Sequence, residues 1–130
     1  MQLSKHFSEA EFLRSETAIK NDIKNTWSLA KHKTNAIYLC EKVLEPLREI
    51  FGRIRITSGY RTKQLNSLVS KTPNSLHTSG RAADIFPLDV SLEEVWQYVK
   101  AHHNGGRAIH RKHNFIHLDT GTTRIFNYDY

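Results

Sequence analysis

The sequence has few of the residues that cross-link a chain or anchor it in a membrane. It contains one cysteine, Cys40, so an intramolecular disulfide is excluded. Cys40 falls within an apolar helical pattern, which favours a buried structural thiol over a nucleophile. No window approaches the roughly 18 apolar residues of a membrane span, and residues 1–7 lack the apolar stretch of a signal peptide. We therefore expect a chain that is made in the cytoplasm and has no membrane span.

Repeats, low-complexity tracts and linkers are also missing, which predicts a single domain over residues 1–130. A length of 130 residues suits one core. A mixture of 38% hydrophobic and 25% charged residues is typical of globular rather than disordered chains. Six Phe, five Tyr and two Trp provide bulk for that core without a disulfide.

Acidic residues are too few to balance the basic ones. The 13 Asp and Glu stand against 19 Lys and Arg, for a net charge of +6. This excess favours an anionic partner. It does not distinguish nucleic acid, an acidic membrane and an acidic polymer, and a basic surface without a specific partner is equally consistent with it. Because no basic helix or aromatic platform stands out, we expect no nucleic-acid partner.

The first half of the chain shows mainly helical patterns. Ser8-Glu-Ala-Glu11 forms a capping box that predicts a short helix. Residues 20–34 are polar and predict an ordered loop or a weak helix. Apolar residues at three- and four-residue steps predict a longer helix over residues 37–51, with Gly52 as its stop and Pro46 as a kink or a division.

The second half of the chain alternates between strand and helix patterns. Strands are predicted over residues 53–57, 81–86, 107–109 and 114–119. Helices are predicted over residues 61–70 and, from a second capping box at Ser91, to about His102. Helices first, then strands with helices between them, indicate an α+β fold with a mainly antiparallel sheet flanked by helices.

Two of the eight histidines stand in patterns that predict a metal site. The first, His77, precedes Asp84 in Ser75-Leu-His77-Thr-Ser-Gly80-Arg-Ala-Ala-Asp84. Gly80 permits a tight turn that could bring His77 beside Asp84. A histidine nitrogen and an aspartate oxygen presented in this way are good ligands for Zn²⁺. Lone histidines such as His6, His32 and His102 are expected on the surface.

The third metal ligand is predicted from a separate strand. In Phe115-Ile-His117-Leu-Asp119, the side chains of His117 and Asp119 share one face. Two imidazoles and one carboxylate leave a fourth zinc position for water, which distinguishes a catalytic site from a structural one. The metal would lower the pKa of that water towards about 7. By spacing alone, Asp119 could instead be a strand-end residue that binds backbone amides.

These motifs resemble those of one enzyme family. Ser75-x-His77-x-x-Gly80-x-Ala82-x-Asp84, followed by Phe115-x-His117-x-Asp119, resembles the zinc D-alanyl-D-alanine carboxypeptidase family. This family includes vancomycin-resistance dipeptidases, phage endolysins, murein endopeptidases and the hedgehog signalling domain fold. Thr57-Ser-Gly-Tyr-Arg61 is similar to the family's Ser-Gly-Tyr-Arg segment, and residues 3–12 resemble the start of small, often phage-encoded members. The likeness spans nearly the whole chain.

The resemblance implies a hedgehog/DD-peptidase-like fold with zinc bound by His77, Asp84 and His117. It also implies hydrolysis of peptide bonds in the stem peptides of bacterial peptidoglycan, by a carboxypeptidase or an endolysin-type endopeptidase. Arg61 is expected to clamp a substrate carboxylate or to stabilise an oxyanion, with a surface salt bridge as the alternative. Ser75 is expected to form a hydrogen bond with the substrate or with a residue that supports a metal ligand. The alternative is a serine that caps a turn.

The sequence departs from the family at the expected general base. Many members have Asp or Glu three residues before the last ligand, where this chain has Asn114. An amide cannot accept a proton at useful pH, so Asn114 is not expected to act as the base. We expect it to contact the substrate instead. The candidates for the base are Asp119, His113 and His110. We favour Asp119, which could instead orient His117 as a hydrogen-bond acceptor.

The missing carboxylate motivates an alternative function. In this alternative the protein is a catalytically impaired, zinc-containing module that binds the bacterial wall. With either function we expect a monomer that acts on the cell wall if it is released or delivered.

Overall fold

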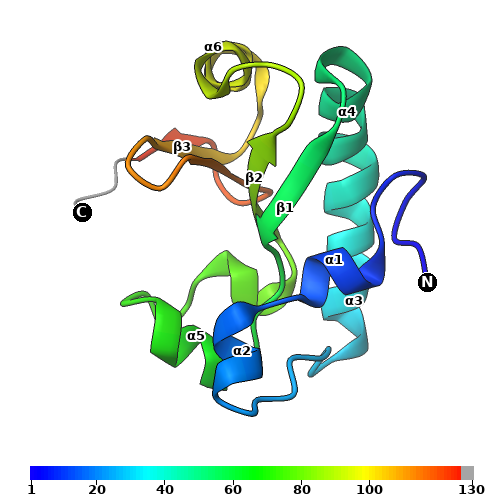
Figure 1. Cartoon of the computed structure of the whole chain (residues 1–130), viewed down its shortest axis with the longest axis vertical. Coiled ribbons are helices and arrows are strands. Elements are labelled where there is room, and N and C mark those ends of the chain that lie inside the picture. Colours follow the sequence, from blue (N-terminus) through cyan, green and yellow to red (C-terminus); the bar gives the residue numbers. More distant parts are fainter. Residues whose placement is uncertain (127–130) are drawn as a thin grey trace.

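The chain folds into helices packed on a mostly antiparallel sheet, which confirms the predicted α+β class (Figure 1). The computed structural model describes residues 1–126. Its helices are α1 (Glu9–Leu13), α2 (Glu16–Lys20), α3 (Ala30–Leu39), the π-helical η1 (Cys40–Leu44), α4 (Glu45–Phe51), α5 (Lys63–Val69), the 3₁₀-helical η2 (Leu76–Ser79) and α6 (Leu92–His102). No helix in the described range is long and apolar enough to cross a membrane.

Within the described residues, five strands form one sheet in the order β1-β2-β4-β3-β5. The strands are β1 (Ile54–Ser58), β2 (Ala82–Pro87), β3 (Gly106–His110), β4 (Phe115–Asp119) and β5 (Arg124–Ile125). The pairs β1–β2, β2–β4 and β4–β3 are antiparallel, whereas β5 pairs in parallel with β3. The fifth strand corrects our prediction, in which residues 114–119 were the last strand. A strand of two residues is too short to show an alternating pattern.

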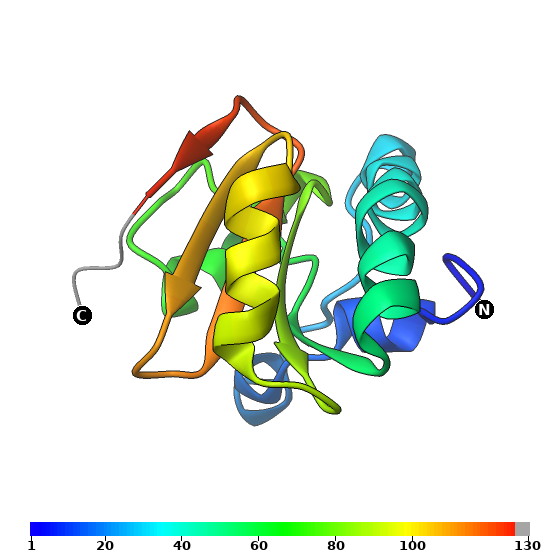
Figure 2. The same ribbon diagram turned by 90° about the horizontal axis from the view of Figure 1, so that it is seen from above.

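One face of the sheet is apolar and covered by helices. Ile56, Ile85 and Ile116 are cross-strand partners with at most 8% exposure. They belong to a core cluster that includes residues of η1, α4 and α6. Figure 2 shows α6 running along the strands and the α3–η1–α4 rod to the right of the sheet. Because side chains alternate across a strand, the adjacent residues Asp84 and His117 face the other side.

The predicted long helix is divided near Pro46, as its sequence suggested. Pro46 has no N–H, so the bond that an α-helix would make to the Lys42 carbonyl is missing. The N–H of the preceding residue, Glu45, donates to the Cys40 carbonyl, five residues back. The hydrogen-bond ladder therefore widens by one residue and continues. Gly52 ends the helix with a φ of 85°. The Cys40 thiol is buried as predicted, and this burial raises its pKa to about 12.

Residues 20–34 are held in place by tertiary contacts that their composition does not show. The Asn25 amide donates to the carbonyl oxygens of Leu13 and Tyr60, both at 2.8 Å. His32 was expected on the surface but is buried in α3, and its Nδ1 lies 2.9 Å from the Tyr60 hydroxyl. The expectation for His32 was therefore wrong, because its partner is distant in sequence.

Glu45 of α4 connects the N-terminal segment to the helical rod. Its carboxylate accepts hydrogen bonds from the Ser4 hydroxyl at 2.5 Å and the His6 N–H at 2.7 Å. Burial alone would raise the pKa of Glu45, but these bonds outweigh burial and lower the pKa below its ordinary value. Replacing Glu45 with glutamine is expected to reduce the free energy of unfolding by about 1–2 kcal/mol at neutral pH.

This loss of stability should depend on pH. A carboxylate whose pKa is lowered by folding stabilises the protein fully above its ordinary pKa of 4.5. The contribution disappears as pH falls through the lower folded value. Chemical denaturation at neutral and acidic pH tests this, with Glu49→Gln on the exposed side of the same helix as a control. Equal effects of the two substitutions, or a Glu45 effect that does not shrink in acid, would contradict the assignment.

Candidate metal centre

A short turn between α5 and β2 brings His77 to the sheet. His77 lies in η2, where its N–H donates to the Ser75 hydroxyl at 3.3 Å. Gly80 follows with a left-handed φ of 76°, and a Cβ at this position would collide with the His32 carbonyl oxygen. Glycine is therefore needed where the chain turns back into β2. This confirms the turn that the sequence predicted at Gly80.

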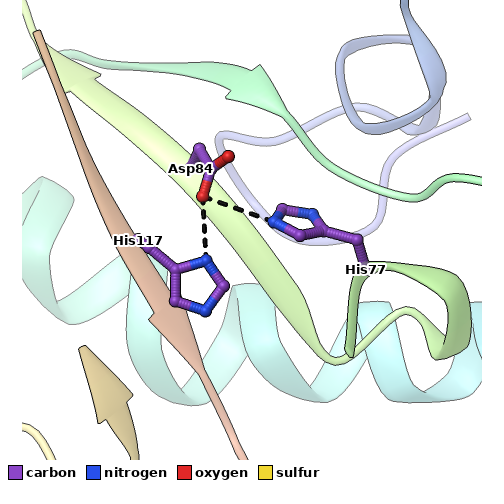
Figure 3. A group of neighbouring side chains, drawn as sticks. All are labelled: His77, Asp84 and His117. Carbon is purple, nitrogen blue, oxygen red and sulfur yellow. Dashed lines mark hydrogen bonds and ion pairs between the residues drawn. The ribbon is translucent and has the colours of Figure 1, made fainter. Parts of the chain in front are cut away.

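Asp84 and His117 meet because of the register between β2 and β4. They are directly opposed cross-strand partners on the face away from the apolar core. Nδ1 of His117 lies 2.9 Å from Oδ1 of Asp84, and Nε2 of His77 lies 3.3 Å from the same oxygen (Figure 3). The three candidate ligand atoms lie within 4.8 Å of one another. The structure therefore brings together the three residues predicted to bind metal.

Hydrogen bonds behind the imidazoles leave one nitrogen of each ring for a metal. Nδ1 of His77 lies 2.7 Å from the Gly59 carbonyl oxygen, which can only accept, so this nitrogen carries the proton. Nε2 of His117 lies 2.8 Å from Oδ2 of Asp119. In the neutral rings, the lone pairs therefore sit on His77 Nε2 and His117 Nδ1, which both face Asp84. Two nitrogens and a carboxylate oxygen held in this way fit zinc.

Charges and burial within the cluster favour the protonation states that a cation requires at Asp84 and His77, whereas His117 holds an additional proton. Burial would raise the pKa of Asp84, but the two histidines outweigh burial and hold that pKa below its usual range. Burial lowers the pKa of His77. Burial would also lower the pKa of His117, but its bonds to Asp119 and Asp84 raise it to about 9. A metal ion would therefore meet an ionised carboxylate and a neutral His77, and would displace a proton from His117.

Arg61 lies beside the same carboxylate, in the segment between β1 and α5. Its Nη2 is 3.7 Å from Oδ2 of Asp84. Its Nε donates to the Ser58 hydroxyl at 3.2 Å, and its Nη1 donates to the buried Asn66 side-chain carbonyl at 2.9 Å. These contacts hold the guanidinium in one orientation next to the candidate ligands.

The cluster opens onto a cleft of about 620 Å³. Arg61 and Ser75 border this cleft together with His77, Asp84 and His117. Residues of α2, of the segment after α5 and of the sheet edge form its walls. A cleft of this volume is typical of sites that bind small organic ligands.

Asn114 does not lie with the other predicted site residues. It is exposed in the turn between β3 and β4, with a φ of 57°, and it is not among the described residues that line the cleft. Asparagine adopts this left-handed conformation more readily than most residues. The structure therefore places Asn114 in a turn outside the cleft lining, and its contact with the substrate stays a prediction. The structure also places His113 and His110 outside the cleft lining, and the buried His110 ring stacks on Phe115.

Asp119 borders the cleft, but its carboxylate is committed to other groups. Oδ2 faces His117, and Oδ1 accepts from the N–H groups of Gly106 and Gly121, both at 2.9 Å. Arg124 donates to both oxygens. Burial would raise the pKa of Asp119, but these bonds outweigh burial and hold it below its usual range. A saturated carboxylate with a low pKa is a poor general base, so the geometry favours the role of orienting His117.

Sequence reasoning missed two groups at this centre. The Gly59 carbonyl lies within the Ser58-Gly-Tyr-Arg61 segment, but a backbone oxygen has no side-chain signal of its own. Arg124 follows the last predicted strand, and no motif marked it.

A His–Asp–His cluster beneath a cleft, on the polar face of an antiparallel sheet, defines an α+β protein with a candidate catalytic metal centre. The chain belongs to the Peptidase M15 family, whose model matches residues 5–119. This confirms the resemblance inferred from the motifs. The chain is also 31% identical over 80 residues to a Haemophilus influenzae protein named "Probable peptidoglycan L,D-endopeptidase MepK". The match covers 58% of this chain and 43% of that protein, less than half of the relative's length.

Proposed function

We propose that the protein is a zinc-dependent peptidase that hydrolyses peptide bonds in the stem peptides of bacterial peptidoglycan. The convergence of His77, Asp84 and His117 beneath an open cleft carries this proposal. Membership of the Peptidase M15 family supports peptide hydrolysis, and the name of the Haemophilus relative supports peptidoglycan as the substrate. The proposed zinc peptidase domain spans residues 1–130 and acts as a monomer.

The protein's own residues would hold the metal and orient the substrate. Nε2 of His77, a carboxylate oxygen of Asp84 and Nδ1 of His117 are the proposed ligands. Zinc bound there supplies Lewis-acid chemistry, since it polarises a carbonyl and lowers the pKa of water towards about 7. Arg61 presents a fixed cation that binds a substrate carboxylate or stabilises developing negative charge. Asp119 holds the His117 ring in the orientation that binding requires.

A muropeptide assay tests this function. Metal-replete protein is incubated with uncross-linked stem peptides and with cross-linked dimers, and the products are identified by mass spectrometry. We expect shorter peptides that disappear with a chelator and return when zinc is added. Release of terminal D-alanine identifies a carboxypeptidase, and cleavage within a stem or a crosslink identifies an endopeptidase. Metal-replete protein that leaves both kinds of substrate intact would rule out the peptidase.

A wall-binding module is the second candidate function. Asn114 lies outside the cleft lining and the Asp119 carboxylate is saturated, so neither offers a free carboxylate to the candidate metal. Such a module would bind zinc and muropeptides without cleaving them. Equilibrium binding of muropeptides to the zinc-loaded protein, measured beside the turnover assay, separates the two candidates.

A further inference from the structure

The short strand β5 brings a second arginine to the metal centre. Arg124 is the Cα partner of Gly106 in β3, and the Arg124 N–H donates to the Gly105 carbonyl at 3.2 Å. Two residues later, the Phe126 N–H donates to the Arg107 carbonyl at 3.2 Å. These backbone bonds fix the Arg124 and Phe126 side chains at the edge of the cleft, which both residues line.

Arg124 binds Asp119 through both of its terminal nitrogens. Nη1 lies 3.1 Å from Oδ1, and Nη2 lies 2.9 Å from Oδ2. The carboxylate is completely buried, whereas the Arg124 side chain is 40% exposed. A guanidinium held by two parallel bonds fixes the plane of a carboxylate, which a single bond would leave free to rotate.

Glycines on both sides leave room for this pair. A Cβ added at Gly106 would collide with both Asp119 oxygens and with Nη1 of Arg124. At Gly121 a Cβ would lie 3.1 Å from Oδ1 of Asp119 and 3.2 Å from Nη1 of Arg124. Both glycines also donate their N–H groups to Oδ1. The backbone therefore approaches the ion pair closely at both glycines.

Phe126 links the same arginine to a candidate ligand. The Arg124 guanidinium lies 5.3 Å from the centre of the Phe126 ring, within the range of a cation–π contact. The Phe126 ring and the His117 imidazole meet in a T-shaped arrangement, with 5.1 Å between their centres. Arg124 thus supports His117 by two routes, through the Asp119 carboxylate and through the Phe126 ring.

We propose that Arg124 is a positioning residue of the metal centre, which fixes Asp119 so that His117 keeps its Nδ1 directed at the metal position. This inference rests on the proposed zinc site. A direct role on the substrate fits the geometry less well, because both terminal nitrogens of Arg124 are already bound to Asp119. Partners behind a metal-binding histidine typically change metal affinity by about 10- to 100-fold when they are removed.

Zinc affinity of the folded protein tests the positioning role without using hydrolysis. Arg124→Ala is expected to weaken zinc binding about 10- to 100-fold in competition with a chelator. Arg124→Lys is expected to fall between this variant and the wild type, because lysine keeps the charge but not the paired bonds. Arg53→Ala is the matched control, since Arg53 also forms a two-pronged pair, with Asp89, on the surface. Circular dichroism shows whether each variant folds. If Arg124→Ala does not fold, the zinc affinity of Arg124→Lys is compared with that of the wild type instead.

A double-mutant cycle identifies the route through Asp119. If Arg124 acts through this carboxylate, Arg124→Ala adds little to the loss of zinc affinity already caused by Asp119→Asn. Additive losses would overturn the proposed route. Wild-type zinc affinity in Arg124→Ala would overturn the inference but leave the zinc peptidase intact. A wild-type protein that binds zinc yet cleaves no peptide would contradict the proposed function and leave the positioning role standing.

Discussion

Replacing His77 with alanine is expected to remove zinc from the purified protein and to reduce peptide hydrolysis by at least about 10³-fold. His77 provides the one candidate ligand that does not come from the sheet, and its Nε2 faces Asp84 at 3.3 Å. Without it, a carboxylate and one imidazole remain, fewer than the three protein ligands typical of catalytic zinc. Metal analysis of the purified variant beside the muropeptide assay measures both losses.

Thermal unfolding gives a second reading of the same substitution. A metal that binds the folded state alone stabilises it by about 2.7 kcal/mol at a free concentration of 100 times its Kd. Zinc should therefore raise the melting temperature of the wild type but not that of His77→Ala. His102→Ala is the control, because His102 is exposed at the end of α6. Stoichiometric zinc in purified His77→Ala would show that His77 is not a ligand. An equal rise in melting temperature with zinc in His77→Ala and His102→Ala would show the same.

Replacing Arg61 with alanine is expected to lower kcat/KM by about 10²- to 10³-fold while the zinc content stays unchanged. The guanidinium is held by Ser58 and Asn66, and it reaches towards the centre from beside Asp84. A fixed cation at this position stabilises negative charge without reorganising during the reaction. Steady-state kinetics on one defined stem peptide, with metal analysis of the same sample, measure the effect.

The split between kcat and KM shows what Arg61 does. A rise in KM alone indicates binding of a substrate carboxylate, whereas an equal fall in kcat and kcat/KM indicates charge stabilisation in the transition state. Arg61→Lys should recover part of the rate, because a lysine supplies charge without the planar fork. If the Arg61→Ala variant loses zinc as well as activity, Arg61 instead maintains the geometry of the metal site. Unchanged kinetics would show that it is a structural residue.

Much of the fold and the convergence of the three candidate ligands could be predicted because the signals are local. The capping box at Ser8, the stop at Gly52 and the turn at Gly80 each depend on a few adjacent residues, and each is present in the structure. The alternation in β4 also predicted that His117 and Asp119 share a face, and their side chains are in contact. Periodicity and backbone preference act over short distances, so the sequence alone is enough to predict them.

The expectation of a surface position for His32 failed because the deciding partner is distant in sequence. His32 is buried by a bond to Tyr60, 28 positions away. Asn114 lies in a hairpin turn outside the cleft lining, although its spacing from His117 suggested a place at the substrate. Spacing along a chain does not tell which side of a turn a side chain faces.

The sequence by itself determined the α+β class, the two segments that carry the candidate ligands and the chemistry of their donors. Only the tertiary structure decided which donors surround Asp119 and placed Arg124 beside it. The physical reason is that a carboxylate acts as a base or as an acceptor according to how many donors surround it. For Asp119 those donors come from β3, β4, β5 and the Gly121 turn, and only the assembled sheet brings them together.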